Sequence, residues 1–470
     1  METMEPPDRP TGGPAVEVIE TSSLGDRSYL ATDGDAAVVV DPQRDVDRVI
    51  AAAGRLGARI ALVLETHVHN DYVSGGLELS RLTGADYGLA AADEVPFRHV
   101  PVRDGDVLAV SDRLRVRALA TPGHTFHHLS YVLELGGEPA GVFTGGSLLY
   151  GTTGRTDLLG QDHSAELARH QHASARKLAA ALPDGAAVWP THGFGSFCSA
   201  TQSGGDSSTI GDEKRANPAL TLAEQDFVET TLSGLDAYPA YYAHMGVLNL
   251  AGPEPLDLRP PDEATPRDIA AALERGEWVV DLRSRRAFVA SHLLGTVALG
   301  LDGQLATWLG WLIDWGAPVT LLGESAGQVA QAQRELARIG IDRFSGAAAG
   351  RPEELATDGA QLRSTRTASF ADLARALSGA DGELPAPDVV LDVRTGTEWR
   401  ESHVEDAVHV PLHELRDRME DVPAGTVWVH CGSGYRATTA ASLLEAAGRH
   451  VVIVDDAFGS AGEAGVPLAA

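Results

Sequence analysis

The sequence predicts an α/β protein of about three domains, and three observations lead to this prediction. The chain has 470 residues, and a typical domain has roughly 150. Short apolar runs typical of buried strands alternate with helical segments along the chain. A proline-rich stretch from Asn249 to Pro261 separates a longer N-terminal part from an internal repeat. We therefore expect a first domain over residues 1–255, followed by two smaller ones.

Strands and helices alternate in the first domain. Residues 36–41 (Ala-Ala-Val-Val-Val-Asp) predict a buried strand, and a helical pattern follows over residues 46–56. A second buried strand is predicted over residues 60–66. Apolar patterns predict further strands at residues 114–119, 130–135 and 187–189, with polar, glycine-rich turns between them.

The internal repeat predicts two small parallel α/β domains, over residues 262–348 and 362–470. Trp278–Arg283 corresponds to Val389–Arg394, and a Ser-His pair ends eleven residues after the aspartate of each segment, at His292 and His403. Each copy then has a second predicted strand (319–322 and 427–430) and a helix after it (328–339 and 436–447). Residues 357–366 are the predicted linker between the copies.

The charge of the chain excludes several classes of function. Its 37 basic and 66 acidic residues give a net charge of −29, and such a field repels nucleic acid backbones and anionic membrane surfaces. No run approaches the ~18 apolar residues of a membrane span, and the acidic segment Met1–Pro7 lacks the apolar part of a signal peptide. We therefore expect a cytoplasmic protein that binds neither nucleic acid nor membrane.

The two cysteines, Cys198 and Cys431, are too few for a disulfide scaffold, and the second lies in a distinctive loop. This loop follows a predicted strand and opens a predicted helix, so backbone N–H groups and the helix dipole favour an anionic sulfur on Cys431. Four residues separate Cys431 from Arg436, one fewer than in protein tyrosine phosphatases, and this tighter loop suits a single sulfur. The residues of the loop are Cys431, Gly432, Ser433, Gly434, Tyr435 and Arg436.

Together with Asp392, Arg394 and His403, this loop makes residues 362–470 resemble a rhodanese. The resemblance implies a sulfurtransferase in which Cys431 carries sulfane sulfur as a persulfide, Arg436 adds positive charge, and residues 432–435 surround the sulfur. In the middle copy, Gly323 and Gln328 stand in place of the cysteine and the arginine. We therefore expect residues 262–348 to form a degenerate rhodanese-like domain without a nucleophile.

Histidines at the ends of predicted strands indicate a metal site in the first domain. His67, His69 and Asp71 share one turn directly after an apolar strand, where side chains converge on a cleft. The segments Thr121–His124 and Pro190–His192 repeat the pattern of a histidine at a strand end. In this order, the three motifs resemble those of the metallo-β-lactamase fold, which implies an αββα sandwich for the first domain.

Within that fold, Thr191–Cys198 and Gly154–Leu158 resemble persulfide dioxygenases, especially bacterial fusions with a degenerate and then an active rhodanese domain. The resemblance implies one mononuclear Fe(II) ion, with His67 and His124 among its ligands, that serves to oxidise a low-molecular-weight thiol persulfide with O2 to sulfite. Sulfur passed on through Cys431 then joins sulfite as thiosulfate.

The chain departs from that family at two positions. The family's third ligand is the aspartate of a Phe-Thr-Gly-Asp turn, but this chain has Gly146 there, and the remaining candidates are His69, Asp71 and His192. A three-histidine site of His67, His69 and His124 would bind Zn(II) as readily as Fe(II). Tyr72 stands where a histidine of a second metal site is usual, which disfavours a dinuclear hydrolase.

Several alternatives stay open at this stage. Cys198 is by default a core thiol, or it lies in the substrate cleft; Arg155 forms an internal pair with Asp157, or it binds substrate. The first domain is alternatively a Zn-dependent thioesterase or lactonase, or a metal-poor binding domain beside a rhodanese that supplies the whole activity. The carrier thiol, the direction of sulfur transfer and the formation of a homo-oligomer are not fixed by the sequence.

Overall fold

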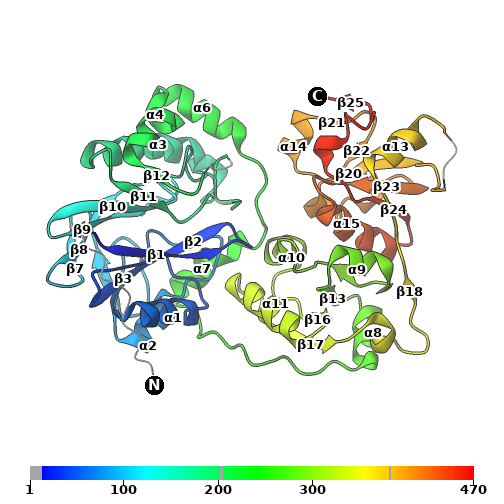
Figure 1. The fold of residues 1–470 in the computed structure, drawn as a ribbon, viewed down its shortest axis with the longest axis horizontal. Coiled ribbons are helices and arrows are strands. Elements are labelled where there is room, and N and C mark those ends of the chain that lie inside the picture. Colours follow the sequence, from blue (N-terminus) through cyan, green and yellow to red (C-terminus); the bar gives the residue numbers. More distant parts are fainter. Residues whose placement is uncertain (1–12, 194, 202–204, 381–382) are drawn as a thin grey trace, which may run out of the picture. The chain divides into compact units, whose positions relative to one another are not determined.

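The computed structural model describes residues 13–193, 195–201, 205–380 and 383–470 (Figure 1). The acidic segment Met1–Pro7 and Phe194 of the Thr191–Cys198 motif lie outside the described residues. The chain divides into two compact units, which we call the N-terminal unit (Met1–Asp257 with Ala337–Gly340) and the C-terminal unit (Leu258–Leu336 with Ile341–Ala470).

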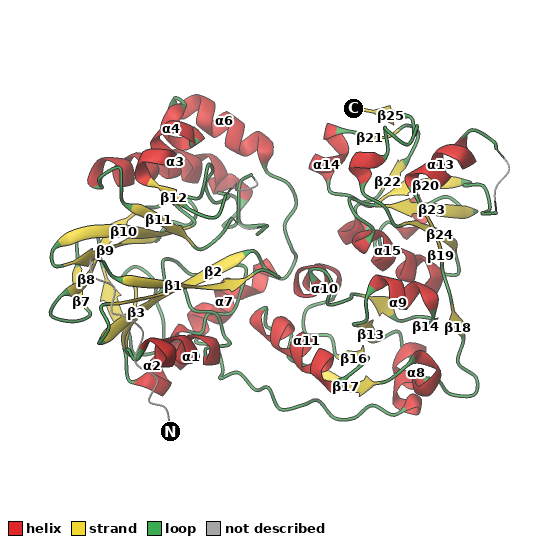
Figure 2. Ribbon diagram, viewed as in Figure 1, coloured by secondary structure: helices red, strands yellow, loops and turns green. Residues whose placement is uncertain are grey.

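Two six-stranded sheets form the centre of the N-terminal unit (Figure 2). The first contains, in spatial order, β1 (Ala15–Thr21), β2 (Asp26–Thr32), β3 (Ala36–Val40), β4 (Arg59–Leu64), β5 (Asp86–Ala90) and β6 (Val100–Val102). The second contains β7 (Val107–Ala109), β8 (Leu114–Ala120), β9 (Leu129–Leu135), β10 (Glu138–Gly145), β11 (Ala187–Pro190) and β12 (Ser208–Thr209). The valines of β3 are buried on both faces, as an inner strand between two layers requires.

Helices cover the outer face of each sheet. Helices α1 (Asp47–Leu56) and α2 (Gly76–Thr83) pack on the first sheet, α3 (Ser164–Ala181) packs on the second, and α6 (Glu224–Gly234) packs against α3. The remaining helices are η1 (Gln161–His163), α4 (Ile210–Ala216), α5 (Pro218–Thr221) and α7 (Tyr242–Ala251). Between the sheets, Tyr29 and Leu64 from one side meet Leu133 and Phe143 from the other. This helix–sheet–sheet–helix sandwich confirms the predicted αββα fold.

The C-terminal unit contains two further sheets of parallel strands. The first has the order β15 (Val297–Ala298), β13 (Trp278–Asp281), β16 (Val319–Gly323) and β17 (Phe344–Ala349), with helices α8 (Pro266–Glu274), α9 (Arg285–Ala290), α10 (Leu305–Leu312), α11 (Ala326–Arg338) and α12 (Pro352–Leu355) in the same segment. The second has the order β19 (Arg366–Ala368), β24 (His450–Val454), β23 (Thr426–His430), β20 (Val389–Asp392) and β22 (Val408–His409), with α13 (Phe370–Leu377), α14 (Gly396–Glu401), α15 (Tyr435–Ala446), η2 (Leu412–Glu414), η3 (Met419–Asp421) and η4 (Phe458–Ser460).

The two copies of the repeat make matching contacts. The guanidinium of Arg394 pairs with Asp392, with Nη2 2.6 Å from Oδ2, and Arg283 pairs with Asp281 at the same distance. The histidine that follows each pair stacks on an aromatic ring, at 3.7 Å between centroids in one copy and 3.9 Å in the other. The repeat seen in the sequence is therefore also a repeat of structure.

The predicted linker over residues 357–366 is not wholly irregular. It contains β18 (Leu362–Arg363), which pairs with β14 (His292–Leu293), and β19 begins at its last residue. The second copy has its own short pair, β21 (His403–Val404) with β25 (Leu468–Ala469). Two-residue strands are set by backbone pairing with a distant partner, which leaves no periodic pattern in the sequence. The boundaries 1–255, 262–348 and 362–470 stay predictions.

Among the described residues, we find no helix that is both long and apolar enough to cross a membrane.

Candidate metal and sulfur sites

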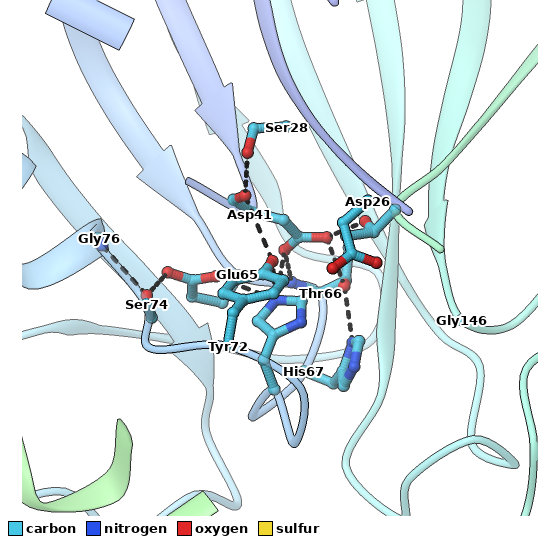
Figure 3. Close-up of polar contacts among 12 residues, drawn as sticks. Asp26, Ser28, Asp41, Glu65, Thr66, His67, Tyr72, Ser74, Gly76 and Gly146 are labelled. Carbon is cyan, nitrogen blue, oxygen red and sulfur yellow. Dashed lines mark hydrogen bonds and ion pairs between the residues drawn. The ribbon is translucent and has the colours of Figure 1, made fainter. Parts of the chain in front are cut away.

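Buried polar side chains gather where strands of both N-terminal sheets end (Figure 3). His67, His69 and Asp71 follow β4, His124 follows β8 and His192 follows β11, as the sequence predicted. All five side chains are nearly inaccessible to solvent. The structure therefore brings every predicted metal ligand into one buried cluster, and it adds four carboxyl and hydroxyl groups, from Asp26, Asp41, Glu65 and Thr66.

A hydrogen bond at Nδ1 fixes the orientation of the His67 ring. Thr66 donates its hydroxyl hydrogen to Asp41 Oδ2 at 2.8 Å, so its oxygen accepts the Nδ1–H of His67 at 2.9 Å. The backbone N–H of Thr66 also donates to Asp41, at 2.6 Å. With Nδ1 protonated, Nε2 of His67 presents its lone pair on the opposite side of the ring.

His124 and His192 are oriented in the same manner. Nδ1 of His124 donates to the carbonyl oxygen of Arg155 at 2.7 Å, and its buried Nε2 has no hydrogen-bond partner among the described residues. Nδ1 of His192 lies 3.0 Å from Asp26 Oδ1 and 3.1 Å from Asp71 Oδ2. Its Nε2 lies 3.4 Å from Nε2 of His67. At this distance the lone pairs of two unprotonated ring nitrogens would repel each other, so a proton or a cation must lie between them.

His69 is held differently from the other three. Its Nε2 lies 3.2 Å from Asp41 Oδ1, 3.2 Å from Glu65 Oε2 and 3.0 Å from the hydroxyl of Tyr72. Its Nδ1 has no hydrogen-bond partner in the part of the chain that the structure describes, and it lies 4.0 Å from Asp71 Oδ1. The Nε2 atom of His69 therefore contacts carboxylates, and its Nδ1 atom is the nitrogen that faces the other histidines of the cluster.

Electrostatics divide these histidines into two kinds. Burial lowers the pKa of His124 to about 3, and burial with its histidine neighbours holds the pKa of His67 well below its ordinary value. Burial also opposes the charge of His69, but Asp41 and Glu65 outweigh it and raise the pKa to about 10. For His192, Asp71 and Asp26 likewise outweigh burial and raise the pKa to about 9. Neutral imidazoles and buried carboxylates beside one another form an environment that favours a cation.

The cluster fits a divalent metal ion. Two nitrogens bound at 2.0–2.1 Å to one tetrahedral ion lie about 3.3 Å apart, close to the 3.4 Å between His67 and His192. One nitrogen each from His67, His69 and His192 lie within 4.8 Å of one another. Nδ1–H donation to a carbonyl, hydroxyl or carboxylate, as His124, His67 and His192 show, is the usual support of a metal-bound histidine.

Gly146 lies where its backbone leaves no room for a side chain. A Cβ atom there would lie 2.3–2.9 Å from three ring atoms of His124. The backbone cannot move away easily, because its carbonyl oxygen accepts hydrogen bonds from Gly154 N at 2.8 Å and from Gln171 Nε2 at 2.9 Å. The ring of His124 thus occupies the space that a longer residue at position 146 would need.

We expect Gly146→Ala to destabilise the N-terminal unit by about 1–3 kcal/mol, the usual cost of overpacking. The measurement is the midpoint of denaturant unfolding. Gly54→Ala is the matched control, because Gly54 lies in α1 and no atom of the described residues would lie within 4 Å of a Cβ added there. This control should be neutral or stabilising by about 0.4–1 kcal/mol. Equal midpoints for the two variants would contradict the crowding at Gly146.

Cys198 and Arg155 lie on two segments that pair beside His124. The backbone N–H of Arg155 donates to the carbonyl of Cys198 at 2.8 Å, and Ala200 N donates to Thr153 O at 2.9 Å. Cys198 is buried, and burial with the charges of Asp71 and Asp26 raises the pKa of its thiol well above the ordinary value. Arg155 pairs with Asp157 through Nε at 2.7 Å and Nη2 at 2.8 Å, which is the internal pair that the sequence suggested.

Sequence reasoning missed Asp26 and Asp41, although they orient three of the histidines. Asp26 begins β2 and Asp41 follows β3, where it adopts a positive φ of 52°. A positive φ in a residue other than glycine marks a strained and often functional position. The available signal for Asp41 was an aspartate that ends a run of buried valines; the start of β2 gave no such signal for Asp26.

The Cys431 loop of the C-terminal unit joins β23 to α15. The backbone N–H of Gly434 donates to Cys431 Sγ at 3.1 Å, and Gly434 has a φ of 93°, a conformation that favours glycine. A Cβ at Gly434 would also lie 2.1 Å from Asp455 Oδ1. The cysteine is buried, and the N–H of Gly434 is the loop contact to its sulfur that the structure shows.

Arg436 closes the far side of this loop. Its guanidinium makes a bidentate pair with Glu398, at 2.5 and 2.7 Å, and lies 5.6 Å from the ring centre of Trp308. The middle copy also contributes Gly300, whose carbonyl oxygen accepts a hydrogen bond from the Tyr435 hydroxyl at 2.9 Å. Residues of the copy that lacks the cysteine therefore contact the loop that has it.

In the middle copy, the side chain of Gln328 bonds to the backbone of its own loop. Gln328 Oε1 accepts the backbone N–H of Glu324 at 2.7 Å, and it lies 3.3 Å from where a side chain on Gly323 would begin. This loop is thus satisfied internally and has no nucleophile.

Comparisons with known proteins agree with the folds of both units. A metallo-beta-lactamase superfamily model matches residues 26–192, and a rhodanese-like domain model matches residues 371–460. The mitochondrial persulfide dioxygenase ETHE1 of Bos taurus is 30% identical over 242 residues, which cover 50% of this chain and 81% of that protein. The cytoplasmic hydroxyacylglutathione hydrolase of Arabidopsis thaliana is 39% identical over 134 residues, which cover 27% of this chain and 51% of that protein.

Among solved structures, a metallo-beta-lactamase from Staphylococcus aureus is similar with a TM-score of 0.64 and 26% identity, over 72% of this chain and 99% of that one. That share is larger than the N-terminal unit, so the likeness continues into the C-terminal unit. The fold and these matches define a metallo-β-lactamase domain joined to a rhodanese-like domain. The chain belongs to the metallo-β-lactamase superfamily and is a relative of the persulfide dioxygenase ETHE1. It also has a rhodanese-like domain, which follows the metallo-β-lactamase domain in the sequence.

Proposed function

We propose that the N-terminal unit oxidises a low-molecular-weight thiol persulfide with O2, and that the C-terminal unit transfers sulfane sulfur through Cys431. A rhodanese-like domain joined to a relative of ETHE1 indicates an enzyme of sulfur metabolism. The observation that carries the proposal is that the buried rings of His67, His124 and His192 lie against one another, in one chain with the Cys431 loop.

The proposed oxidation consumes one persulfide, one O2 and one water, and it yields the thiol, sulfite and two protons. Bound Fe(II) would supply the redox chemistry with O2. His67 and His124 are the proposed ligands, with His69, Asp71 and His192 as further candidates. Thr66 and the carbonyl of Arg155 keep the two ligand rings in place, and burial of the whole cluster excludes water from the reacting sulfur.

A single ion suits the cluster better than two. Tyr72 bonds His69 Nε2 through its hydroxyl, and Asp41 and Glu65 surround the same nitrogen. These contacts engage the groups that a second ion would need. A mononuclear iron site, with Zn(II) as the alternative metal, is therefore the arrangement we propose.

In the C-terminal unit, the Cys431 thiolate would attack the outer sulfur of thiosulfate. The new bond joins Sγ to that sulfur, the S–S bond of thiosulfate breaks, and sulfite leaves with the electron pair. The N–H of Gly434 and the charge of Arg436 stabilise the persulfide anion that remains. In the reverse direction, sulfite from the N-terminal unit accepts this sulfur and becomes thiosulfate.

The middle copy contributes charge to this transfer through Arg285. Arg285 interacts electrostatically with Cys431 and donates from Nε to Asp455 Oδ1 at 2.8 Å. We expect Arg285→Gln to raise the KM for thiosulfate about fivefold, or ~1 kcal/mol, because it removes a positive charge and frees the negative charge of Asp455. Arg286→Gln, at the neighbouring exposed position, is the control. If Arg285→Gln and Arg286→Gln have the same KM for thiosulfate, the middle copy does not contribute charge to sulfur transfer.

The full chain, loaded with Fe(II) under anaerobic conditions, provides the test of the oxidation. We expect glutathione persulfide to cause O2 uptake, with about one sulfite formed per O2 consumed. If protein with one iron per chain takes up no O2, the dioxygenase half of the proposal is wrong.

A Zn-dependent hydrolase is the second candidate, and the likeness to the Arabidopsis hydroxyacylglutathione hydrolase favours it. Zinc at one per chain with thioester hydrolysis and no O2 uptake would select that candidate. The absence of an aspartate ligand at Gly146 favours a third candidate function, in which the N-terminal unit binds persulfide carriers without a metal ion. Metal content near zero with intact thiosulfate–cyanide transfer would select it.

A further inference from the structure

We propose that Cys198 supplies the negatively charged metal ligand that position 146 lacks, beside nitrogens of His124 and His192. This inference rests on the proposed function only in that the N-terminal unit binds a metal ion. Sγ of Cys198 and one nitrogen each from His124 and His192 lie within 4.8 Å of one another, and all three residues are buried.

A second observation points to a ligand at this place. Nε2 of His124 is buried without a hydrogen-bond partner in the described structure, and its lone pair is free because Nδ1 donates to the Arg155 carbonyl. On the other side, Nε2 of His67 and Nε2 of His192 face each other at 3.4 Å. The sulfur of Cys198 and one nitrogen each from His124 and His192 thus lie together, and nitrogen with sulfur is a donor set that divalent transition metals prefer.

The position of Cys198 is built into the fold. Gly154 and Ser199 form an antiparallel bridge, and the backbone bonds on either side tie residues 153–155 to residues 198–200. Gly154 also packs directly against His124, because a Cβ atom there would lie 2.6 Å from its Nδ1. Cys198 and His124 therefore come from segments held to each other by hydrogen bonds.

The carboxylates of the cluster lie against histidine nitrogens. Asp71 and Asp26 contact Nδ1 of His192, the nitrogen that faces away from His67. Asp41 and Glu65 contact His69. These groups orient histidines, as outer-shell carboxylates do, whereas Sγ of Cys198 lies within 4.8 Å of a nitrogen of His124 and a nitrogen of His192. A thiolate there gives the site the same charge that an aspartate at position 146 would give.

Binding in this manner forms a metal–sulfur bond, breaks the S–H bond of Cys198 and releases one proton to the solvent. No electron is transferred. These three ligands would leave one position of a tetrahedral Zn(II) ion open, and three positions of a six-coordinate Fe(II) ion.

The test uses the full chain, stripped of metal and titrated with Co(II). A cobalt–thiolate bond produces a strong near-ultraviolet charge-transfer absorption. We expect one equivalent of Co(II) to produce it in the wild-type protein and in Cys431→Ser, which removes the other cysteine. We expect Cys198→Ser to lose about nine-tenths of the absorption and to bind Co(II) at least tenfold more weakly, since a ligand is missing.

Cys198→Asp provides a second variant, since it replaces one acidic ligand with another. We expect it to bind one Co(II) per chain without the charge-transfer absorption. Three results would each overturn the assignment. The wild-type protein could bind cobalt without that absorption, the absorption could persist in Cys198→Ser, or the wild-type protein could bind no cobalt. Absence of O2 uptake by iron-loaded protein that shows the cobalt–thiolate absorption would instead overturn the proposed oxidation and leave Cys198 as a ligand.

Discussion

His124→Ala is expected to reduce bound iron below about a tenth of the wild-type content and to abolish O2 uptake with glutathione persulfide. The reason is that Nε2 of His124 is a buried nitrogen with no hydrogen-bond partner among the described residues, so its loss removes a ligand that nothing nearby replaces. Even outer-shell changes at metal sites cost about 10–100-fold in affinity. Metal analysis of protein purified without O2, together with an oxygen electrode, provides the measurement.

His127→Ala is the matched control for this variant. His127 lies three residues further along the same segment, and it is exposed and paired with Asp93 at 2.8 Å. We expect its iron content and O2 uptake to equal those of the wild-type protein. Full iron content in His124→Ala would show that the metal is bound elsewhere.

Cys431→Ser is expected to lower thiosulfate–cyanide sulfur transfer about 1,000-fold or more, because it removes the nucleophile that carries the sulfur. The variant should also lose the mass increase of one sulfur atom that thiosulfate produces on the intact wild-type chain. Serine has nearly the shape of cysteine, so the Cys431 loop should keep its conformation.

Ser378→Ala, an exposed substitution in the same unit, serves as the control and should transfer sulfur at the wild-type rate. O2 uptake in Cys431→Ser should be unchanged, since the N-terminal unit has its own buried cluster. Sulfur transfer at the wild-type rate by Cys431→Ser would mean that the loop is not the site of transfer.

Much of the fold could be predicted because its strands are strongly apolar. The buried runs before Asp41 and Thr66 were recognisable as inner strands, and β3 and β4 lie there. The repeat was visible because Asp281 and Asp392 each precede an arginine and a histidine at fixed spacing. The pairing of β14 with β18 could not be foreseen, because two-residue strands depend on a partner almost 70 residues away.

The candidate site was predictable only where its residues follow strands in short motifs. His67, His124 and His192 have that pattern, and the structure brings them together. Asp26 has no such motif, because it acts on His192 across 166 residues of sequence. The place of Cys198 depends on the pairing of residues 153–155 with residues 198–200, a tertiary contact between irregular segments that no local pattern encodes.

The matching Asp–Arg pairs of the two copies in the C-terminal unit lie in the first half of each copy, whereas Cys431, the proposed nucleophile, lies in the second half. The pair that joins strand to loop in the first half is intact in both copies. In the second half of the middle copy, Gln328 accepts a hydrogen bond from the backbone of its own loop, and no cysteine is present. A duplicated domain of this kind can lose its reactive residue through changes in one loop and still fold. It can then contribute residues that contact the loop of the other copy.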